Sequence, residues 1–523
     1  REEIEKQAKK IKENVYAIQF PTTTKSNFDA YPYTFEWNRK PINNKKEKIR
    51  LLFIFPWFKV GGADKFNLDL ISRLDQNKFD ITIVTTEMSE YIWRQKFEKY
   101  AEVFDLTSFL HRQDWPAFIH YLMKSRNIDI VMNSNSYFGF YVIPWLKSKF
   151  PEVVFTDYLH SENKSWRNGE YPRDSTAIDG FLDRTYTCTK VLRKSMKENM
   201  NRSIDNVETV YIGVDEKEFD KNKIKIEDNE DLKQKLDYIK GKKVILFLCR
   251  ISEEKRPIFI IKVLKKLVEK DSNIILLVVG DGPELKEMKE TARKDGVLGN
   301  IIFFGMQSNV KPFYKIADVS VICSLVEGLT ITTYESLAME TPVVTADVGG
   351  QKELVDDTCG RVVKNIQTAE NGYFNRDYEE EEIKRYVIAI EEVLKDKKLK
   401  ENCRNKILNG FTVENMAKTL EKEFEVFAKE GSKIDPKSVV NEDLYKQYIM
   451  MYNQLDIRNY FPQDGGNFSL DEEARRYKIA KIKGILWENS LWRGFIKFLK
   501  ATGIMKIIKK SGMKQKIKKI IQK

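Results

Sequence analysis

Two glutamates near the middle of the chain, Glu327 and Glu335, are separated by seven residues. The β-branched run at 318–323 predicts a buried strand just before them, and the residues after Glu327 predict a helix. Glu327 would lie at the carboxyl end of a strand, where open α/β sheets bind ligands. The first amides of the helix, at Leu329, Thr330 and Ile331, lack acceptors within the helix and can bind an anion. This pattern favours a ligand with phosphates and hydroxyls, such as a sugar nucleotide, although a glutamate pair is also common on an ordinary βα turn.

Two basic residues, Arg250 and Lys255, follow the predicted strand at 244–248. Because the carboxyl ends of parallel strands meet at one edge of a sheet, these cations are expected beside the Glu327 loop. Two cations at this place could stabilise a departing diphosphate, as a metal ion does in other enzymes. The alternative is a solvated run of charges, because acidic and basic residues flank both positions.

The first half of the chain offers two weaker signals at the ends of predicted strands. Gly61 and Gly62 follow the strand at 50–55, and glycines there let the backbone approach a phosphate. His160 follows the strand at 153–158. A glycine pair is weak evidence by itself, and a single histidine is more often structural.

Strand and helix patterns alternate along the chain, which predicts an α/β protein with parallel, doubly wound sheets. A length of 523 residues is long for one core and predicts two domains with extensions. The expected boundaries are an N-terminal extension at 1–47, a first Rossmann-like domain at 48–220, a charged linker at 221–243, a second Rossmann-like domain at 244–411, a crossover helix at 412–430, and a C-terminal extension with basic amphipathic helices at 431–523.

Four motifs occur in the same order as in a known family. They are Cys249-Arg-Ile-Ser-Glu-Glu-Lys-Arg-Pro257, Gly280-Asp-Gly-Pro-Glu284, the Glu-x7-Glu pair, and Gly349-Gly-x-x-Glu353. Together, over about residues 240–365, they resemble the retaining glycosyltransferases of family 4, whose first motif reads Gly-Arg-Leu-x-x-Glu-Lys-Gly. The resemblance implies the GT-B fold, in which two Rossmann-like domains face a central cleft. It implies that residues 48–220 form the acceptor domain and residues 244–411 the nucleotide-sugar domain. It also implies a retaining, metal-independent transfer of a sugar from a nucleotide-sugar donor, with no cofactor.

The resemblance assigns a role to each candidate residue. Arg250 and Lys255 would neutralise the diphosphate, Glu327 would bind hydroxyls of the transferred sugar, and Glu335 would bind the ribose. Gly305 and Met306 would border the base, and His160 would lie near the sugar and the diphosphate. Donor contacts are also expected at Gly61, Gly62, Leu329, Thr330 and Ile331. The chain departs from the family at Asp64, where a glutamate is usual, and at Glu340, where many relatives have a glycine.

Composition limits the compartment and the metal chemistry. The five cysteines are scattered and include no Cys-x-x-Cys pair, which favours a reducing cytoplasm. The three histidines form no cluster with metal-ligand spacing, so we expect no metal site. No apolar run approaches the ~20 residues of a membrane span, and the polar start shows no signal peptide. These features predict a cytoplasmic protein.

The basic charge of the chain is concentrated in its last fifty or so residues. Residues 475–523 contain sixteen Lys or Arg and one acid, so this tail has a net charge of +15. The whole chain has a net charge of +12, so the rest of the chain carries −3. Trp492, Phe495 and Phe498 recur there at helical spacing among basic residues. A basic amphipathic helix with aromatic residues favours attachment to an anionic membrane surface. Docking on a protein is the main alternative, and no nucleic-acid-binding motif accompanies the charge.

These observations predict a peripheral enzyme at the inner face of the cell membrane that glycosylates a lipid-linked or polymeric cell-envelope glycan. Two alternatives stay open: a protein O-glycosyltransferase that acts on Ser or Thr, and a non-catalytic sugar-binding partner subunit. The sequence leaves open the donor, the acceptor and whether the chain forms a homo-oligomer.

Overall fold

The computed structural model describes residues 47–59, 61–162 and 170–435. The chain divides into two compact units, Arg1–Val439 and Val440–Lys523, and all described residues belong to the first. The predicted basic tail and nearly all of the predicted N-terminal extension therefore lie outside the described residues.

The first domain is built on a seven-stranded parallel sheet with the order β3-β2-β1-β4-β5-β6-β7. Its central strands are almost entirely buried, which is typical of a parallel sheet covered on both faces. The order reverses between β1 and β4, so the loops after β1, β4 and β5 lie next to one another at the switch point. The strands are β1 (Ile49–Phe55), β2 (Phe79–Thr85), β3 (Glu102–Asp105), β4 (Ile130–Ser134), β5 (Val154–Leu159), β6 (Arg184–Thr187) and β7 (Val207–Thr209).

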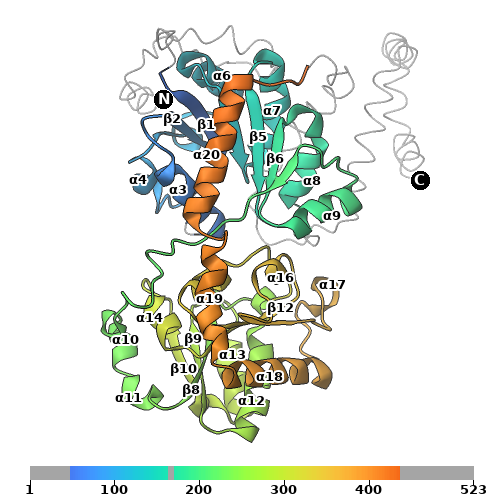
Figure 1. Cartoon of the computed structure of the whole chain (residues 1–523). Coiled ribbons are helices and arrows are strands. Elements are labelled where there is room, and N and C mark those ends of the chain that lie inside the picture. The colour runs from blue at the N-terminus through green and yellow to red at the C-terminus, as the bar shows by residue number, and fades with distance from the viewer. Residues whose placement is uncertain (1–46, 60, 163–169, 436–523) are drawn as a thin grey trace, which may run out of the picture. The chain divides into compact units, whose positions relative to one another are not determined.

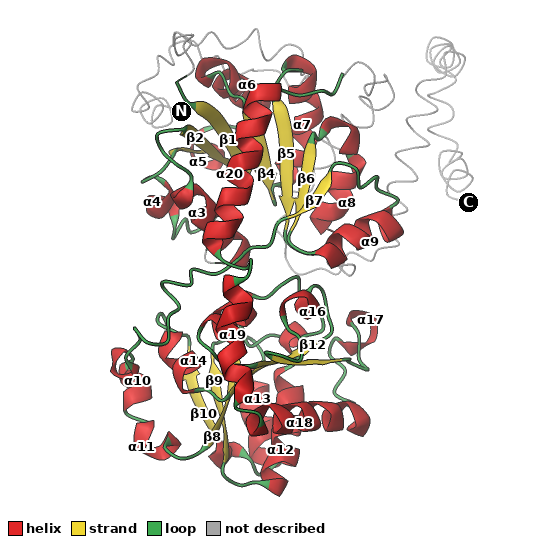
Figure 2. Cartoon of the chain, viewed as in Figure 1, coloured by secondary structure: helices red, strands yellow, loops and turns green. Residues whose placement is uncertain are grey.

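Helices connect these strands, and their buried faces complete the core (Figure 2). Many of them begin at a side-chain cap: Ser136 accepts a hydrogen bond from the amide of Gly139, and Thr189 accepts one from the amide of Leu192. The helices are α3 (Gly62–Arg73), α4 (Arg94–Phe97), α5 (Leu106–Phe109), α6 (Trp115–Arg126), α7 (Tyr137–Lys149), α8 (Glu170–Ala177) and α9 (Lys190–Met200).

The second domain is built on a six-stranded parallel sheet with the order β10-β9-β8-β11-β12-β13. In this order β8 and β11, which precede the Lys255 and Glu327 loops, are direct neighbours. The strands are β8 (Lys243–Leu248), β9 (Ile274–Val279), β10 (Ile301–Gly305), β11 (Val319–Ile322), β12 (Val343–Ala346) and β13 (Gly360–Val363). Its helices are α10 (Glu230–Lys233), α11 (Leu236–Ile239), α12 (Pro257–Lys270), α13 (Leu285–Lys294), α14 (Lys311–Ile316), α15 (Ile331–Ala338), α16 (Gln351–Leu354), α17 (Ala369–Gly372), α18 (Glu380–Lys395) and α19 (Lys398–Leu408).

The chain passes twice between the domains, and the two crossings are hydrogen-bonded to each other. The amide of Val214 donates to the carbonyl of Phe411 at 3.1 Å, and the amide of Val413 donates to the carbonyl of Val214 at 3.0 Å. Gly213 is needed here, because a Cβ on it would lie 2.5 Å from the backbone of Thr412. After the second crossing, α20 (Val413–Glu430) runs along the first sheet, against α3, β1 and β4 (Figure 1).

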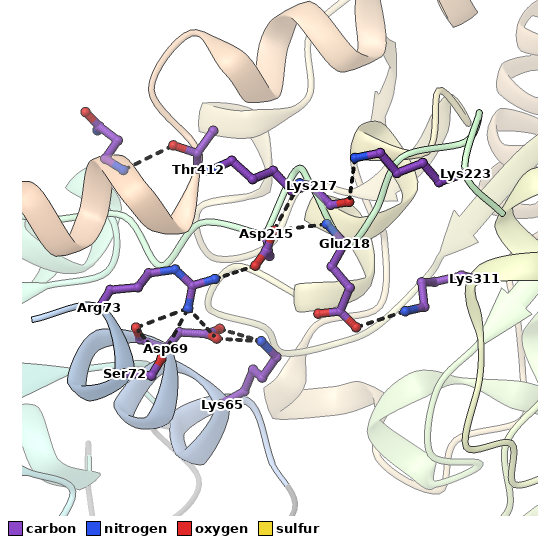
Figure 3. Close-up of polar contacts among 11 residues, drawn as sticks. Lys65, Asp69, Ser72, Arg73, Asp215, Lys217, Glu218, Lys223, Lys311 and Thr412 are labelled. Atoms are coloured by element: carbon purple, nitrogen blue, oxygen red, sulfur yellow. Dashed lines mark hydrogen bonds and ion pairs between the residues drawn. The ribbon is translucent and has the colours of Figure 1, made fainter. Parts of the chain in front are cut away.

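Charged side chains hold the first crossing to both domains (Figure 3). Arg73 of α3 forms an ion pair with Asp215, and Asp69 of the same helix pairs with Lys65 at 2.6 Å and with Arg73 at 3.3 Å. On the other side, Glu218 pairs with Lys311 of α14 at 2.9 Å. Within the described residues, no helix has both the length and the apolar composition needed to cross a membrane.

Candidate active site

The loops after β8 and β11 bring a cation and a carboxylate into contact. The Nζ of Lys255 lies 2.5 Å from the Oε1 of Glu327, and the Oγ of Ser324 donates to the same oxygen at 2.6 Å. Both charged side chains are largely buried. Burial lowers the pKa of Lys255, but the Glu327 carboxylate outweighs it and raises the pKa above its ordinary value. Lys255 is therefore fully charged at neutral pH and is held against Glu327.

Arg250 lies in the same loop as Lys255 but has a different partner. Its Nη2 donates to the Oε1 of Glu254 at 2.7 Å, and its side chain is 71% exposed. The structure thus joins Lys255 to Glu327 directly, whereas Arg250 is held by its own loop at the surface.

The start of α15 faces the glycine loop of the first domain. Thr330 caps the helix: its Oγ1 accepts a hydrogen bond from the amide of Thr333 at 3.3 Å. A Cβ on Gly62 would lie 3.4 Å from the Cδ1 of Ile331, so these two segments are in contact distance. The amides of the first turn have no acceptor within the helix and attract negative charge. An anion held here would meet backbone amides from one domain and a glycine loop from the other.

Glu335 lies one turn into α15 and accepts a hydrogen bond from the hydroxyl of Tyr314 at 2.8 Å. Burial raises the pKa of this glutamate to about 7, although the Tyr314 hydroxyl and the charge of Lys65 lower it. Glu335 is therefore poised between its neutral and charged forms near neutral pH. Either form can bind hydroxyl groups, but only the carboxylate accepts with both oxygens.

The end of β10 supplies the two residues predicted to border the base. Gly305 has a φ of 66°, a left-handed conformation that favours glycine, and its carbonyl accepts a hydrogen bond from the amide of Gly280 at 2.7 Å. The side chain of Met306 is 84% exposed. Met306 therefore presents accessible side-chain surface at the end of the edge strand.

His160 lies at the end of β5, where its Nε2 is 3.3 Å from the Oγ of Ser134 and its ring meets Phe66 edge-on. Burial lowers the pKa of His160 to about 3, so the imidazole is neutral at physiological pH. A neutral ring can donate or accept a hydrogen bond but adds no positive charge near a diphosphate. The backbone at His160 also packs closely against the second domain, because a Cβ on Gly328 would lie 2.4 Å from the carbonyl oxygen of His160.

The backbone of the Gly-Gly-x-x-Glu motif packs closely against the Glu327 loop. Gly349 has a φ of 54°, and a Cβ on it would lie 2.0 Å from the carbonyl oxygen of Glu327. Glu353 accepts hydrogen bonds from the amides of Lys190 and Val191, at 2.9 and 2.8 Å, and from the hydroxyl of Tyr211 at 2.7 Å. Glu353 thus binds the first turn of α9 in the other domain, a contact that its place in the motif did not reveal.

Asp64, the departure in the glycine loop, is a buried carboxylate. Burial raises its pKa to about 7, while hydrogen bonds from the Lys59 backbone and the Trp57 side chain lower it. These contacts lie within the loop after β1. The position therefore stabilises the loop that carries Gly61 and Gly62.

The domain that carries Lys255, Glu327 and Glu335 can be compared with known proteins. Residues 228–409 match the family model of glycosyl transferases group 1. An uncharacterized glycosyltransferase of Methanocaldococcus jannaschii is 30% identical over 212 residues, which are 39% of this chain and 54% of that protein. An alpha-monoglucosyldiacylglycerol synthase of Streptococcus pneumoniae is 34% identical over 134 residues, 25% of this chain and 30% of the synthase. The chain thus spans between 30% and 54% of the length of these two relatives.

A solved structure extends the comparison to both domains. HepE of Anabaena, in complex with UDP, is similar over 72% of this chain and 100% of its own, with a TM-score of 0.58 and 16% sequence identity. At this identity the likeness shows the fold alone. It confirms the predicted GT-B architecture of two Rossmann-like domains.

Proposed function

We propose that the chain is a retaining, metal-independent glycosyltransferase that moves a sugar from a nucleotide sugar to a lipid-linked or polymeric glycan of the cell envelope. The observation that carries the proposal is the contact of Lys255 with Glu327 beside the first turn of α15, opposite Gly62. This arrangement offers a cation and the amides at the start of α15 to a diphosphate and a carboxylate to a sugar, all at one edge of the sheet. The match of residues 228–409 to group 1 glycosyltransferases supports glycosyl transfer as the reaction.

The leaving group gains negative charge as the bond to the sugar breaks. Lys255 and the amides of Leu329, Thr330 and Ile331 would stabilise that charge, and Arg250 would reach the diphosphate from the exposed side of its loop. Stabilisation that grows in the transition state raises the turnover rate rather than ground-state affinity alone. The protein's own cations would thus supply the electrostatic help that a metal ion supplies elsewhere.

The remaining residues would orient the donor. Glu327, held by Ser324 and Lys255, would accept hydroxyls of the transferred sugar. Glu335 would accept the ribose hydroxyls in its charged form, with Gly305 and Met306 beside the base. His160 would contribute a hydrogen bond to the sugar rather than charge, because its pKa is about 3.

The acceptor and the place of action are inferred from one relative and from the basic tail of the chain. The name of the Streptococcus pneumoniae relative describes a glycolipid synthase, which is consistent with a lipid acceptor here. Residues 475–523, outside the described part of the chain, would bind the anionic inner face of the cell membrane through their +15 charge and aromatic residues. The enzyme would then meet its acceptor at the cytoplasmic surface.

A donor screen tests this proposal. The purified chain is incubated with UDP-, GDP- and ADP-sugars, with and without an envelope lipid extract, and the release of nucleoside diphosphate is measured. We expect release with one donor class and stimulation by the extract. Lys255→Ala should lower the rate of release about a hundredfold, whereas Glu290→Gln, at an exposed position on α13, should retain it. No release with any donor, or equal release by Lys255→Ala, would refute the assignment.

A further inference from the structure

Arg256, the residue next to Lys255, has an unusual backbone conformation. Its φ and ψ are 58° and 53°, in the left-handed region that few residues other than glycine, asparagine and aspartate adopt. In the family motif that this loop resembles, Arg256 stands at the final glycine. A glycine would satisfy this backbone at lower cost, so any advantage of an arginine here has to come from its side chain.

That side chain is buried in a charged network. Arg256 is 2% exposed and Glu382 is 0% exposed. The Nη1 of Arg256 donates to the Oε1 of Glu382 at 2.7 Å, and its Nη2 donates to the Oε1 of Gln367 at 3.0 Å. The second oxygen of Glu382 accepts the backbone amide of Gln367 at 3.2 Å, and the guanidinium stacks on the ring of Phe259 at 3.9 Å. The network therefore ties the Lys255 loop to α18 and to the segment after β13.

The same network touches the loop that carries Glu327. The Nη1 of Arg256 also lies 3.5 Å from the carbonyl oxygen of Cys323, and the Sγ of Cys323 lies 3.4 Å from the carbonyl oxygen of Lys255. The two loops are also joined by a backbone hydrogen bond, in which the amide of Leu325 donates to the carbonyl of Glu254 at 2.8 Å. Arg256 thus lies where the Lys255 loop and the Glu327 loop meet. It is the neighbour in the chain of Lys255, whose ammonium is 2.5 Å from Glu327.

We propose that Arg256, through its ion pair with Glu382, is a positioning residue that fixes the Lys255 ammonium relative to Glu327. The inference rests on the proposed glycosyl transfer, in which Lys255 stabilises the leaving group. A buried ion pair contributes little net stability, because desolvation of both charges offsets their attraction. Its directional hydrogen bonds do restrict geometry, and a small displacement of a catalytic group lowers the rate steeply.

The test separates positioning from stability with a double variant. Arg256→Gly alone leaves Glu382 buried without its cation and should lower the melting temperature. In Arg256→Gly/Glu382→Gln, glycine accepts the left-handed backbone, and the new amide can pair with Gln367. We expect the double variant to regain the wild-type melting temperature within a few degrees while its kcat stays at or below one fifth of the wild-type value. The donor KM should change less than twofold.

A kcat above one fifth of the wild-type value in a double variant that has regained the wild-type melting temperature would overturn the proposal, since Arg256 would then act on stability alone. If the double variant does not fold, Arg256→Lys decides by the same threshold, because lysine keeps the charge but not the two-pronged hydrogen bonding. The control is Arg126→Gln/Glu102→Gln, which removes an Arg–Glu pair, at 2.9 Å, from the first domain and should leave kcat unchanged; its arginine is buried and its glutamate is exposed. Failure of the underlying function is distinguishable, because then the wild type itself releases no nucleotide or Lys255→Ala is as active as the wild type.

Discussion

Replacing Glu335 with glutamine should stabilise the protein in a pH-dependent way. Burial raises the pKa of Glu335 from 4.5 to about 7 in the folded protein. The folded state therefore holds its proton more tightly than the unfolded chain does. The stability that this gives is fully present below pH 4.5 and is lost as pH rises toward 7, because the unfolded state ionises first. The loss amounts to roughly 3 kcal/mol at pH 7 and above.

Glutamine has the same shape, cannot ionise, and can still accept the hydrogen bond of Tyr314, which is 2.8 Å in the wild type. Urea unfolding of the wild type and Glu335→Gln would be measured at pH 4, 5.5, 7 and 8.5. The difference between the two free energies of unfolding at pH 4 serves as the reference. Relative to it, we expect the variant to gain roughly 3 kcal/mol over the wild type by pH 7. Other titrating groups cancel in the difference, and Glu290→Gln serves as the control at an exposed position.

Parallel stability curves for the wild type and Glu335→Gln between pH 4 and 7 would refute this reasoning. They would mean that water or a conformational change lets Glu335 ionise in the folded state at its ordinary pKa. A gain limited to pH values above 8 would also contradict it, because the pH window follows from a folded pKa of about 7.

Four further outcomes are expected. The affinity for UDP, measured by calorimetry, should fall between pH 8 and pH 6 in the wild type more than in Glu335→Gln, because the proposed ribose contact needs the carboxylate. An equal change of affinity with pH in both proteins would contradict that role. Lys255→Ala or Arg250→Ala should lower kcat about a hundredfold, or roughly 3 kcal/mol, with the fold retained; wild-type turnover in both variants would remove the assignment. Activity should survive thorough EDTA treatment, and loss that Mg²⁺ or Mn²⁺ restores would show that the cations of the loop are insufficient. Truncation after Ala474 should abolish co-sedimentation with anionic liposomes, and unchanged sedimentation would exclude residues 475–523 as the anchor.

The sequence alone predicted the parallel architecture, which is confirmed, and it predicted the sheet edge at which the candidate site would lie. Buried apolar runs alternate with amphipathic segments, and such periodicity is a property of near neighbours along the chain, so it can be recognised without a structure. The positions of Lys255 and Glu327 after two such runs predicted that both lie at one sheet edge. Their 2.5 Å contact is consistent with that prediction, because β8 and β11 are neighbours in the sheet. The left-handed backbone of Glu340, with a φ of 59°, likewise fits the missing glycine at that position.

Only the tertiary structure decided which partner each charge has and which protonation state it favours. Arg250 and Lys255 look equivalent in the sequence, yet one pairs with Glu254 at the surface and the other with a largely buried Glu327. Arg256 and Glu382 are 126 residues apart, and no local pattern connects them. The pKa values of Glu335 and His160 depend on how many atoms exclude water from each side chain. Those atoms come from strands and helices distant in sequence, so burial and its electrostatic consequences exist only once the chain has folded.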